Sequence, residues 1–376
     1  MTDPAGRPHG SGQRIAFFGS SLVSSYWNGA ATYYRGLLRA LAEHGHAITF
    51  YEPDAFERQQ HRDIPDPDWA RVVVYAAAND ENDEDGVLAA LDAARGADLV
   101  VKASGVGVFD ELLEREALAL QGPATRVVFW DVDAPATLER MAADPRDSLR
   151  ALVPRYDLIL TYGGGPKVVD AYRRLGARDC IPVYNALDPS THHPVPPDPR
   201  FACDLAFLGN RLPDREERVK EFLCRPAAAL QHREFLLGGS GWEAGPSGSL
   251  PANVRPLGHV STRDHNAFNC TPRAVLNVNR DSMARFGHSP ATRLFEAAGA
   301  AACMVSDAWD GIEGFLEPDR EILLAESGDQ VAAVLEALTP ERARAIGQAA
   351  LRRVLAEHTY RHRADQVQAI LEGVAV

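Results

Sequence analysis

The segment DPSTHHPVPPDPR, Asp188–Arg200, divides the sequence into two halves of similar pattern. It contains five prolines in 13 residues, which excludes a helix or a central strand there. On both sides of it, short apolar runs alternate with helical patterns, as in the βαβ units of a doubly wound parallel sheet. The sequence therefore predicts an α/β protein with two doubly wound lobes, a cleft between them and this segment as the hinge.

The first half starts its alternation at Arg14–Gly19, RIAFFG, a short apolar run that leads into a Gly-Ser-Ser loop. A helix is expected over Gly29–His44, because apolar residues recur there at helical spacing. Two further helices are expected over Phe109–Leu120 and Lys167–Leu175. The other strand candidates are rich in Val, Ile and aromatic residues, as buried parallel strands are: Ile48–Tyr51, Val72–Tyr75, Leu99–Val101, Val127–Trp130, Leu158–Leu160 and Ile181–Tyr184.

The second half repeats the pattern and ends in two long helical stretches, Pro340–Glu357 and Arg361–Leu371. Helices are also expected near Glu216–Leu223 and over Pro290–Ala298. The strand candidates are Leu205–Leu208, Phe235–Leu237, Val254–Leu257, Val275–Val278, Met304–Val305 and Ile322–Leu324. The expected organisation is a disordered tail (1–13), a first lobe (14–187), the hinge (188–200), a second lobe (201–338) and a helical tail (339–376).

The composition excludes several classes of protein. The chain has 39 basic and 52 acidic residues, a net charge of −13, which disfavours nucleic acid and anionic membranes as partners. No apolar run is long enough to span a membrane, and the polar N-terminus does not resemble a signal peptide. Five scattered cysteines without a CxxC pair indicate reduced thiols and a cytoplasmic protein. The oligomeric state stays open.

Motifs of other enzyme classes are incomplete or missing. Gly105-Val106-Gly107 and Gly238-Gly239-Ser240-Gly241 each follow an apolar run, but neither completes GxGxxG, which counts against a dehydrogenase. Tight turns are the alternative interpretation of both. No GxSxG or HExxH sequence is present, and His192-His193 lacks further ligands at metal-site spacing. The sequence therefore predicts no metal site and no cofactor.

The most informative stretch is His288–Gly299, HSPATRLFEAAG. Ser289 suits an N-cap, Pro290 a first helical position, and Gly299 the position after the helix. The packed face would hold the apolar residues, and the opposite face Thr292, Arg293 and Glu296. An ordinary capped helix with an exposed Arg–Glu pair is the alternative.

A helix in this place can bind a nucleotide. The main-chain N–H groups over 289–292 would hold an anion, assisted by the helix dipole. Glu296 would lie about 9 Å along the axis from the start, so that one helix could hold a diphosphate and a neighbouring ribose. Three further loops follow predicted strands of the same lobe and carry candidate contacts to phosphate or base: Asn210 and Arg211, His259, and Arg280.

Three stretches resemble one known family: FLGNRLPDRE (207–216), FWDVDAPATL (129–138) and residues 257–300. They are similar to the bacterial CgeB-like (spore maturation protein) glycosyltransferases of the GT-B fold. The resemblance implies two Rossmann-like lobes, of which the second binds a nucleotide-sugar donor such as a UDP-sugar and the first binds the acceptor. It also implies that the helical tail returns to the first lobe. By position, Glu296 would bind the ribose hydroxyls. His288 replaces the first Glu of the retaining E-x7-E motif and is closer to the inverting pattern, so the stereochemistry stays open.

The first lobe offers candidates for the acceptor side and for a general base. Ser20, Ser21, Asn28 and Gly29 flank its first loop. Asp131 and Asp133 follow a predicted strand on the same side of it, and either carboxylate would deprotonate an acceptor hydroxyl. A helix cap is the alternative role of Asp133, because Pro135 opens a helix.

These observations favour a metal-independent glycosyltransferase that moves a sugar from a nucleoside diphosphate to a hydroxyl or amine. The donor is then a substrate, and no cofactor is required. Two other functions stay open: a nucleotide-sugar epimerase of the same fold, and a non-catalytic CgeB-like binding or spore-coat protein.

Overall fold

A computed structural model describes residues 12–26, 28–77, 84–242 and 250–373. The expected disordered tail, residues 1–13, lies outside this part of the chain except for its last two residues. The chain divides into two compact units. The first comprises residues 1–184 and 360–376, and the second comprises residues 185–359.

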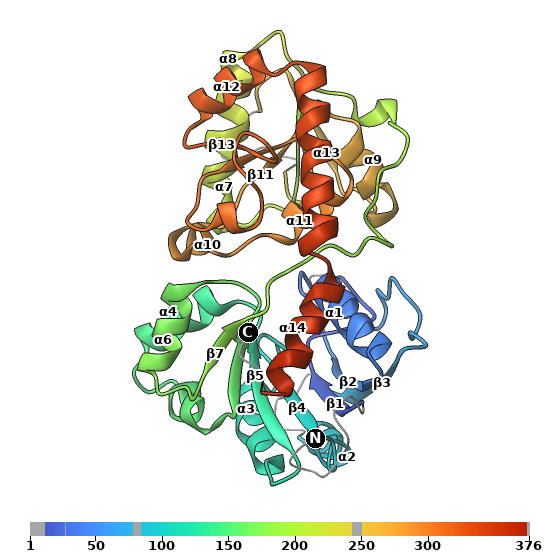
Figure 1. Ribbon diagram of the computed structural model, residues 1–376, viewed down its shortest axis with the longest axis vertical. Coiled ribbons are helices and arrows are strands. Elements are labelled where there is room, and N and C mark those ends of the chain that lie inside the picture. The colour runs from blue at the N-terminus through green and yellow to red at the C-terminus, as the bar shows by residue number, and fades with distance from the viewer. Residues whose placement is uncertain (1–11, 27, 78–83, 243–249, 374–376) are drawn as a thin grey trace. The chain divides into compact units, whose positions relative to one another are not determined.

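The first unit is built on a seven-stranded sheet, shown in Figure 1. Its strand order is β3-β2-β1-β4-β5-β6-β7, and every pairing is parallel. The strands are β1 Arg14–Phe18, β2 Ala47–Asp54, β3 Ala70–Ala76, β4 Leu99–Ala103, β5 Arg126–Asp131, β6 Leu158–Thr161 and β7 Cys180–Pro182. This is the order of the Rossmann fold, in which the chain changes direction across the sheet between its first and fourth strands.

Helices connect these strands, and the last helix of the chain also belongs to this unit. They are α1 Ala31–Glu43, α2 Asp85–Ala93, α3 Asp110–Ala117, α4 Ala134–Ala143, α5 Ser148–Leu152, α6 Pro166–Arg174 and α14 Tyr360–Leu371, with short 3-10 turns at Leu118–Leu120 and Val153–Arg155. Helix α14 packs on α1. Gly36 permits the close approach, since a Cβ there would lie 2.1 Å from the Tyr360 ring.

The second unit repeats the arrangement with six strands in the order β10-β9-β8-β11-β12-β13, again all parallel. They are β8 Leu205–Leu208, β9 Phe235–Gly238, β10 Val254–Gly258, β11 Ala274–Asn277, β12 Met304–Asp307 and β13 Leu323–Ala325. The predicted doubly wound α/β fold is therefore confirmed, with a Rossmann-type sheet in each unit.

The helices of the second unit are α7 Pro213–Val219, α8 Arg225–Ala229, α9 His265–Cys270, α10 Asp281–Phe286, α11 Thr292–Gly299, α12 Gly328–Ala337 and α13 Pro340–Glu357. A π-helical turn, Lys220–Cys224, joins α7 to α8, and 3-10 turns occur at Pro199–Phe201, Thr262–Asp264 and Ile312–Gly314. Helix α13 packs against α11 in this unit. Of the two tail helices expected to return to the first lobe, α14 alone belongs to the first unit.

The proline-rich segment does not form a free linker. Its main chain follows α9: the His193 N–H donates to Asn266 Oδ1 at 3.3 Å, and the Asp198 N–H donates to Thr271 Oγ1 at 2.9 Å. Proline excludes regular structure without excluding packing, because side-chain acceptors can replace the missing ladder partners. The segment is thus part of the second unit, and the boundary between the units lies three residues before the predicted hinge.

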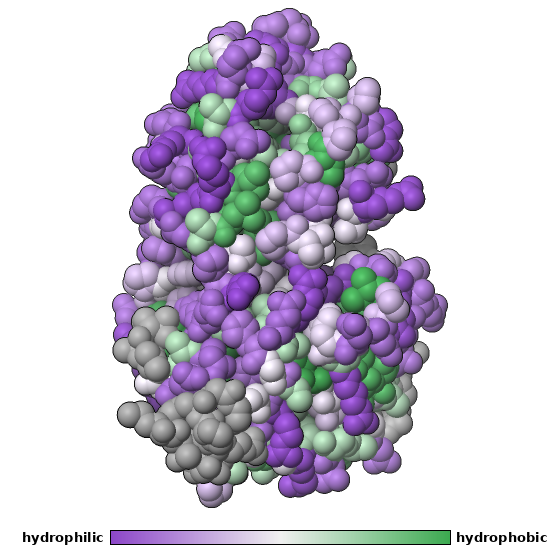
Figure 2. Space-filling model, turned by 45° about the vertical axis from the view of Figure 1, so that its right-hand side comes forward, coloured by the Kyte–Doolittle hydropathy of each residue, from purple (hydrophilic) through white to green (hydrophobic). Residues whose placement is uncertain are grey.

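The surface is mainly hydrophilic on the face drawn in Figure 2, with separate small apolar groups on each unit. Large exposed apolar side chains among the described residues are scattered: Tyr26, Phe56, Val74, Leu88 and Leu355. Within the described ranges, no helix has the length and apolar character needed to cross a membrane.

Candidate functional site

The candidate site lies in the second unit, at the carboxyl ends of β8 and β11. These neighbouring strands are where the order of the sheet reverses, and open α/β sheets bind their ligands in the crevice beyond such a point. Gly209 follows β8, and Val278 follows β11. The loops after both strands therefore meet at one place.

Arg293 connects the two strand ends. Its Nε donates to the main-chain oxygen of Leu208, the last residue of β8, at 2.7 Å. Its Nη1 donates to Oδ1 of Asn277, the last residue of β11, at 3.4 Å. The guanidinium also stacks on the Phe207 ring, 4.8 Å from the ring centre. Gly209 leaves it room, since a Cβ there would lie 2.8 Å from Nη2.

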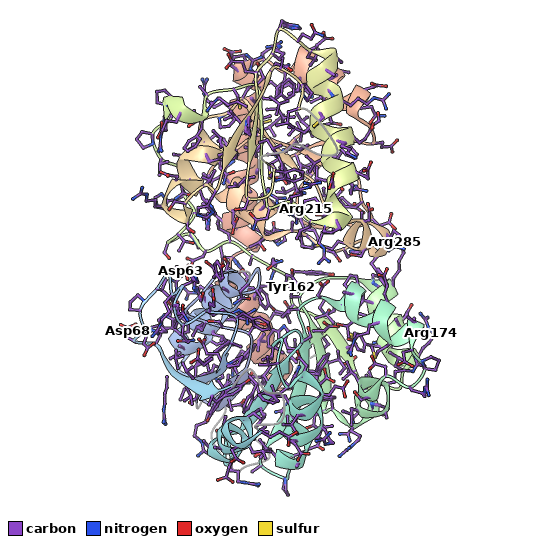
Figure 3. The ribbon with its side chains drawn as sticks, turned by 180° about the vertical axis from the view of Figure 1, so that it is seen from behind. Asp63, Asp68, Tyr162, Arg174, Arg215 and Arg285 are labelled. Carbon is purple, nitrogen blue, oxygen red and sulfur yellow. The ribbon has the colours of Figure 1, made fainter. Side chains whose placement is uncertain are left out.

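This guanidinium is a desolvated cation. Among the described residues it has no carboxylate within ion-pair distance. Burial, together with the nearby charge of Arg215, lowers the pKa of Arg293 to about 9. Arg215 lies on α7, donates to the main-chain oxygen of Asn210 at 3.1 Å and is labelled at this end of the unit in Figure 3. Two arginines in a confined space favour an anionic ligand.

A buried polar layer supports the end of β11. The Asn277 amide donates to Ser306 Oγ at 2.9 Å, and the Asn279 main-chain N–H lies 3.3 Å from both Asp307 carboxylate oxygens. Asp307 is fully buried and is paired with Arg218. Burial raises the pKa of this carboxyl. The layer holds the loop that precedes α11 in place.

The start of α11 differs from the prediction. The helix begins at Thr292 with Ala291 at its N-cap, so Ser289 is not the cap and Pro290 is not the first helical residue. Ser289 is buried, and its hydroxyl donates back to the Gly287 main-chain oxygen at 3.0 Å. Gly299 is the last helical residue, not the one after the helix.

His288 explains why the helix starts late. Its φ of 44° breaks the helical path, and its N–H donates to the Asp310 main-chain oxygen at 2.6 Å. The imidazole packs on Gly311, where a Cβ would lie 2.2 Å from the ring. The first N–H groups of α11, at Thr292 and Arg293, have no acceptor within the helix. They form the positive end of the helix dipole, next to the Arg293 guanidinium.

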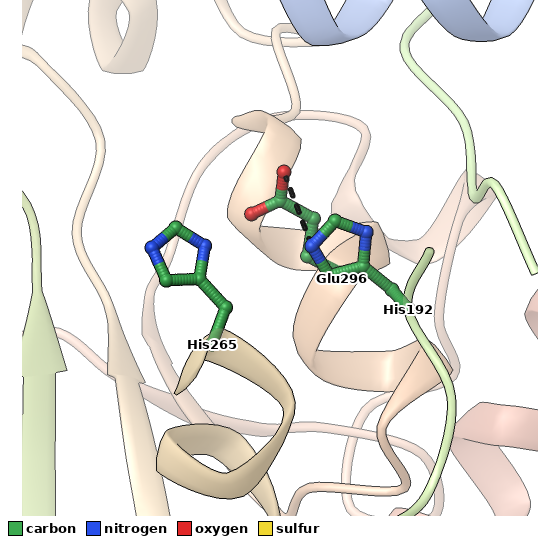
Figure 4. Close-up of side chains that lie close together, drawn as sticks. All are labelled: His192, His265 and Glu296. Carbon is green, nitrogen blue, oxygen red and sulfur yellow. Dashed lines mark ion pairs between the residues drawn. The ribbon is translucent and has the colours of Figure 1, made fainter. Parts of the chain in front are cut away.

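Glu296 lies one turn beyond Arg293 on the same helix and faces two histidines, as Figure 4 shows. Its Oε1 is 3.9 Å from Nε2 of His192, which comes from the proline-rich segment. His265, at the start of α9, completes a group whose ligand atoms all lie within 4.8 Å of one another. Burial lowers the pKa of His265, which favours a neutral ring.

The remaining predicted donor contacts lie around this centre. Arg211 is engaged by Glu216 at 2.8 Å, and Asn210 Oδ1 accepts from the Ser240 N–H at 3.0 Å. His259 is exposed just after β10, and Arg280 occupies the N-cap position of α10. The structure thus brings together Arg293, Glu296 and Thr292 most closely, and places the others in flanking loops.

The glycines after β9 form a tight turn against the end of β8. Gly239 has φ +117°, and a Cβ there would lie 2.2 Å from the Gly209 main-chain oxygen. The same oxygen accepts a bond of 2.7 Å from the Trp242 indole. Close backbone packing therefore accounts for these glycines.

In the first unit, three of the predicted acceptor-side residues form one buried network. Ser20 Oγ donates to Asn28 Oδ1 at 2.9 Å, and the Asn28 amide donates to the Ser21 main-chain oxygen at 2.9 Å. Gly29 is exposed, and α1 begins two residues after it at Ala31. These hydrogen bonds hold the loop after β1 in one conformation, which is a structural role.

The two predicted base candidates differ sharply in environment. Asp131 is fully buried, and its Oδ1 accepts from the hydroxyls of Ser104 at 2.7 Å and Thr137 at 2.9 Å, while Tyr172 donates to Oδ2 at 2.5 Å. Burial raises its pKa. Asp133 is half-buried at the N-cap position of α4, without a side-chain capping bond.

Comparison with known proteins adds to this geometry. Residues 215–369 match the family described as glycosyl transferase-like, which covers most of the second unit. The match is confined to this part of the chain, whereas the arrangement of two Rossmann-type units is that of the GT-B fold. The CgeB-like subgroup expected from the sequence stays a prediction. No curated protein sequence matches the chain.

Solved structures share the fold over nearly the whole chain. Sucrose-phosphate synthase from Thermosynechococcus elongatus is 15% identical, with 96% of this chain and 98% of that chain covered and a TM-score of 0.65. The Anabaena protein HepE in complex with UDP-glucose is 12% identical, with coverage of 96% and 100% and a TM-score of 0.65. A trehalose-6-phosphate protein from E. coli, bound with UDP-2-fluoro glucose, is 13% identical, with coverage of 96% and 99% and a TM-score of 0.68.

Sequence reasoning missed several residues of the candidate site. In the sequence His192 stands beside His193 alone, and folding brings His265 and Glu296 to it. Arg215, Arg218 and Asp307 were not singled out. A signal existed for Asp307 alone, since it lies two residues after the predicted strand Met304–Val305 of a parallel sheet, where ligand-facing polar residues are common.

Proposed function

We propose that the protein transfers a sugar from a UDP-sugar to a hydroxyl or amine acceptor, with no metal ion taking part in the chemistry. The observation that carries this proposal is the arrangement of α11: its first N–H groups, Arg293 and Glu296 share one helix at the point where the sheet reverses. The complexes of similar folds with UDP-glucose and UDP-2-fluoro glucose support the choice of donor.

The start of α11 is suited to bind the diphosphate of the donor. It is the leaving group of the reaction and gains negative charge as the bond to the sugar breaks. Arg293 offers a guanidinium held by Leu208 and Phe207, and the helix dipole adds a fixed positive field. Preorganised positive groups of this kind stabilise a developing anion without reorganising, which is the contribution that a metal ion makes in other transferases.

Glu296 is suited to bind the ribose hydroxyls of the donor. This residue is three positions beyond Arg293, about 4.5 Å along the helix axis, which matches the short distance from a phosphate to the adjoining ribose hydroxyls. A carboxylate accepts two vicinal O–H groups through charge-assisted bonds. The exposed fraction of the Glu296 side chain is 18%, so these bonds would form in a partly desolvated place.

The chemical step is a substitution at the anomeric carbon of the sugar. The acceptor oxygen or nitrogen forms a bond to this carbon, and the bond from the carbon to the diphosphate oxygen breaks with both electrons going to UDP. The acceptor proton goes to a general base, for which Asp133 stays the predicted residue. Asp131 is less suited, because three side-chain hydroxyls already occupy its carboxylate.

Calorimetric titration with UDP tests the donor site. Glu296→Ala is expected to weaken binding by about 1.5–3 kcal/mol, the usual worth of hydrogen bonds to a charged group. Glu336→Ala is the matched control, because this glutamate is exposed on α12 of the same unit. Equal affinity of Glu296→Ala and the wild type would refute the assignment.

A panel of nucleotide sugars with and without acceptors tests the reaction. A transferase releases UDP in proportion to a glycosylated product. Free nucleotide with an altered free sugar, in the absence of acceptor, would indicate an epimerase. Binding without turnover of any donor would indicate a protein that only binds its ligand.

A further inference from the structure

We propose that His192, His265 and Glu296 form a binding site for a late first-row divalent metal ion, with Zn²⁺ the best match. The three side chains come from the proline-rich segment, α9 and α11, all within the second unit. Their ligand atoms lie within 4.8 Å of one another, and His192 Nε2 is 3.9 Å from Glu296 Oε1. In Figure 4 the carboxylate lies between the two rings.

Both histidines have the supporting contacts that metal ligands usually have. His265 Nε2 is 3.3 Å from the Val260 main-chain oxygen, so that nitrogen donates and Nδ1 keeps its lone pair. His192 Nδ1 is 2.9 Å from Thr191 Oγ1, which leaves Nε2 toward the carboxylate. A metal-bound histidine characteristically uses its second nitrogen for such a bond, and this bond fixes the tautomer and the ring orientation.

Among the residues that the structure describes, the carboxylate has no arginine or lysine in direct contact, and the charge of Arg293, one turn away, acts on it only at longer range. Within the described part of the chain, no Arg or Lys pairs with Glu296, and His192 is its one ion-pair partner. The exposed fractions of the two side chains are 7% for His192 and 18% for Glu296. A carboxylate so far removed from water is normally compensated by a cation, and a metal ion held by three ligands supplies that charge.

The donor set selects the class of metal. Two imidazole nitrogens and one carboxylate oxygen suit Zn²⁺ and its neighbours, whereas Mg²⁺ and Ca²⁺ prefer oxygen ligands. Zn–N bonds of about 2.0–2.1 Å place tetrahedral ligand atoms roughly 3.3 Å apart. The three groups would therefore close by about an ångström through side-chain rotation, and a water molecule would take the fourth position.

This site shares Glu296 with the ribose contact of the proposed function. A carboxylate oxygen that ligates a metal is not available to both ribose hydroxyls, so metal and UDP would exclude each other. This exclusion rests on the proposed function, whereas the metal site itself does not. The consequence is a transferase that needs no metal for its chemistry and is inhibited by Zn²⁺ at its donor site.

Zn²⁺ binding by the full chain, after treatment with EDTA and without nucleotide, tests the site directly. A competing chromophoric chelator reports the affinity. We expect one Zn²⁺ per chain in the wild type and a loss of at least about tenfold in affinity, the lower limit for disturbing such a site, in His192→Ala and in His265→Ala. His193→Ala is the matched control, because this neighbour is exposed and outside the group. Mg²⁺ is expected not to compete.

Thermal unfolding provides a second measurement. A ligand that binds only the folded state raises the melting temperature, so Zn²⁺ should stabilise the wild type and His193→Ala but not His265→Ala. His265→Gln replaces the alanine variant if the latter melts early in EDTA. No bound Zn²⁺, or equal binding by the wild type and both His265 variants, would overturn the site. If Zn²⁺ binds as expected and UDP does not weaken it, the metal site stands and the sharing of Glu296 is refuted.

Discussion

Arg293 donates from Nε to the main-chain oxygen of Leu208 at 2.7 Å. This bond fixes a helix residue to the end of β8, while Nη1 of the same side chain reaches Asn277 at the end of β11. The guanidinium is therefore held across the point where the sheet reverses. Its position is set by the fold, so its charge needs little reorganisation to meet an anion.

The first prediction concerns this arginine. Arg293→Ala should weaken UDP binding about 10- to 100-fold, because a hydrogen bond to a charged group is worth about 1.5–3 kcal/mol. Arg293→Lys should recover only part of the affinity, since an ammonium cannot hold the Leu208 bond and face a phosphate at once. Isothermal titration calorimetry with UDP measures both variants.

Arg211→Ala is the control for this prediction. Arg211 lies in the same unit, but its guanidinium is already engaged by Glu216 at 2.8 Å. Its removal should change UDP affinity much less than the removal of Arg293. Equal losses in the two variants would mean that general positive charge, and not the position of Arg293, governs binding.

The second prediction separates Asp131 from Asp133. Asp131→Asn should lower the free energy of unfolding by about 1–3 kcal/mol, because the new amide cannot accept from all the buried donors that surround the carboxylate. Asp133→Asn should leave stability near the wild type and lower turnover by about 10²–10⁴, the usual contribution of a general base. Urea denaturation and the rate of UDP release measure the two effects.

The opposite pattern is informative as well. Normal turnover in a stably folded Asp133→Asn would place the base elsewhere, or would indicate a mechanism in which the leaving phosphate takes the proton. A stable Asp131→Asn with low turnover would assign the role to Asp131 despite its burial.

The fold could be predicted because the composition of the strands, the spacing of apolar residues in the helices and the proline-rich segment all indicate the same architecture. Apolar runs such as Val127–Trp130 are buried on both faces, and buried parallel strands carry this composition. The segment with five prolines marked the change between sheets within a few residues. Its packing on α9 could not be foreseen, because the acceptors Asn266 and Thr271 lie more than 70 positions later.

The site was predictable only where its residues share one helix. Thr292, Arg293 and Glu296 follow helical spacing and can be recognised together. His192 and His265 meet Glu296 through tertiary contacts that no spacing reveals. The false N-cap at Ser289 has a local cause: the left-handed conformation of His288, fixed by its bond to the Asp310 main chain, outweighs the capping preference of a serine before a proline.

The third prediction concerns the buried pair of Arg218 and Asp307. The exposed fraction of the Asp307 side chain is 1%, and that of Arg218 is 21%. Arg218→Met should lower the free energy of unfolding by about 3–5 kcal/mol, the cost of leaving a buried charge uncompensated. Asp307→Asn in the same chain should restore part of the loss, because it removes the unpaired charge. Chemical denaturation of the three variants tests this, and strictly additive losses would contradict it.

The last prediction is a pH dependence of stability in the first unit. His44, just after α1, donates from Nδ1 to the Ala40 main-chain oxygen at 2.7 Å, and its Nε2 lies 2.7 Å from Asp365 of α14. The bond to Ala40, followed by the Asp365 carboxylate, raises the pKa of His44. A histidine whose pKa is higher in the folded state stabilises the protein fully below its unfolded pKa of about 6.5, and this stabilisation is lost as the pH rises through the folded value.

The urea midpoint of His44→Gln should therefore lie further below the wild type at about pH 5.5 than at about pH 8.5, on either side of the titration. The raised pKa requires the protonated ring to be the stabilising form, so a variant that cannot be protonated loses most where the wild type carries the charge. Asp365→Asn should reduce the same pH dependence by removing the carboxylate. His193→Gln, at an exposed position, serves as the control and should follow the wild type at both pH values. A constant difference between His44→Gln and the wild type would show that the ring acts through packing and the Ala40 bond alone, and that its charge does not hold α14 on α1.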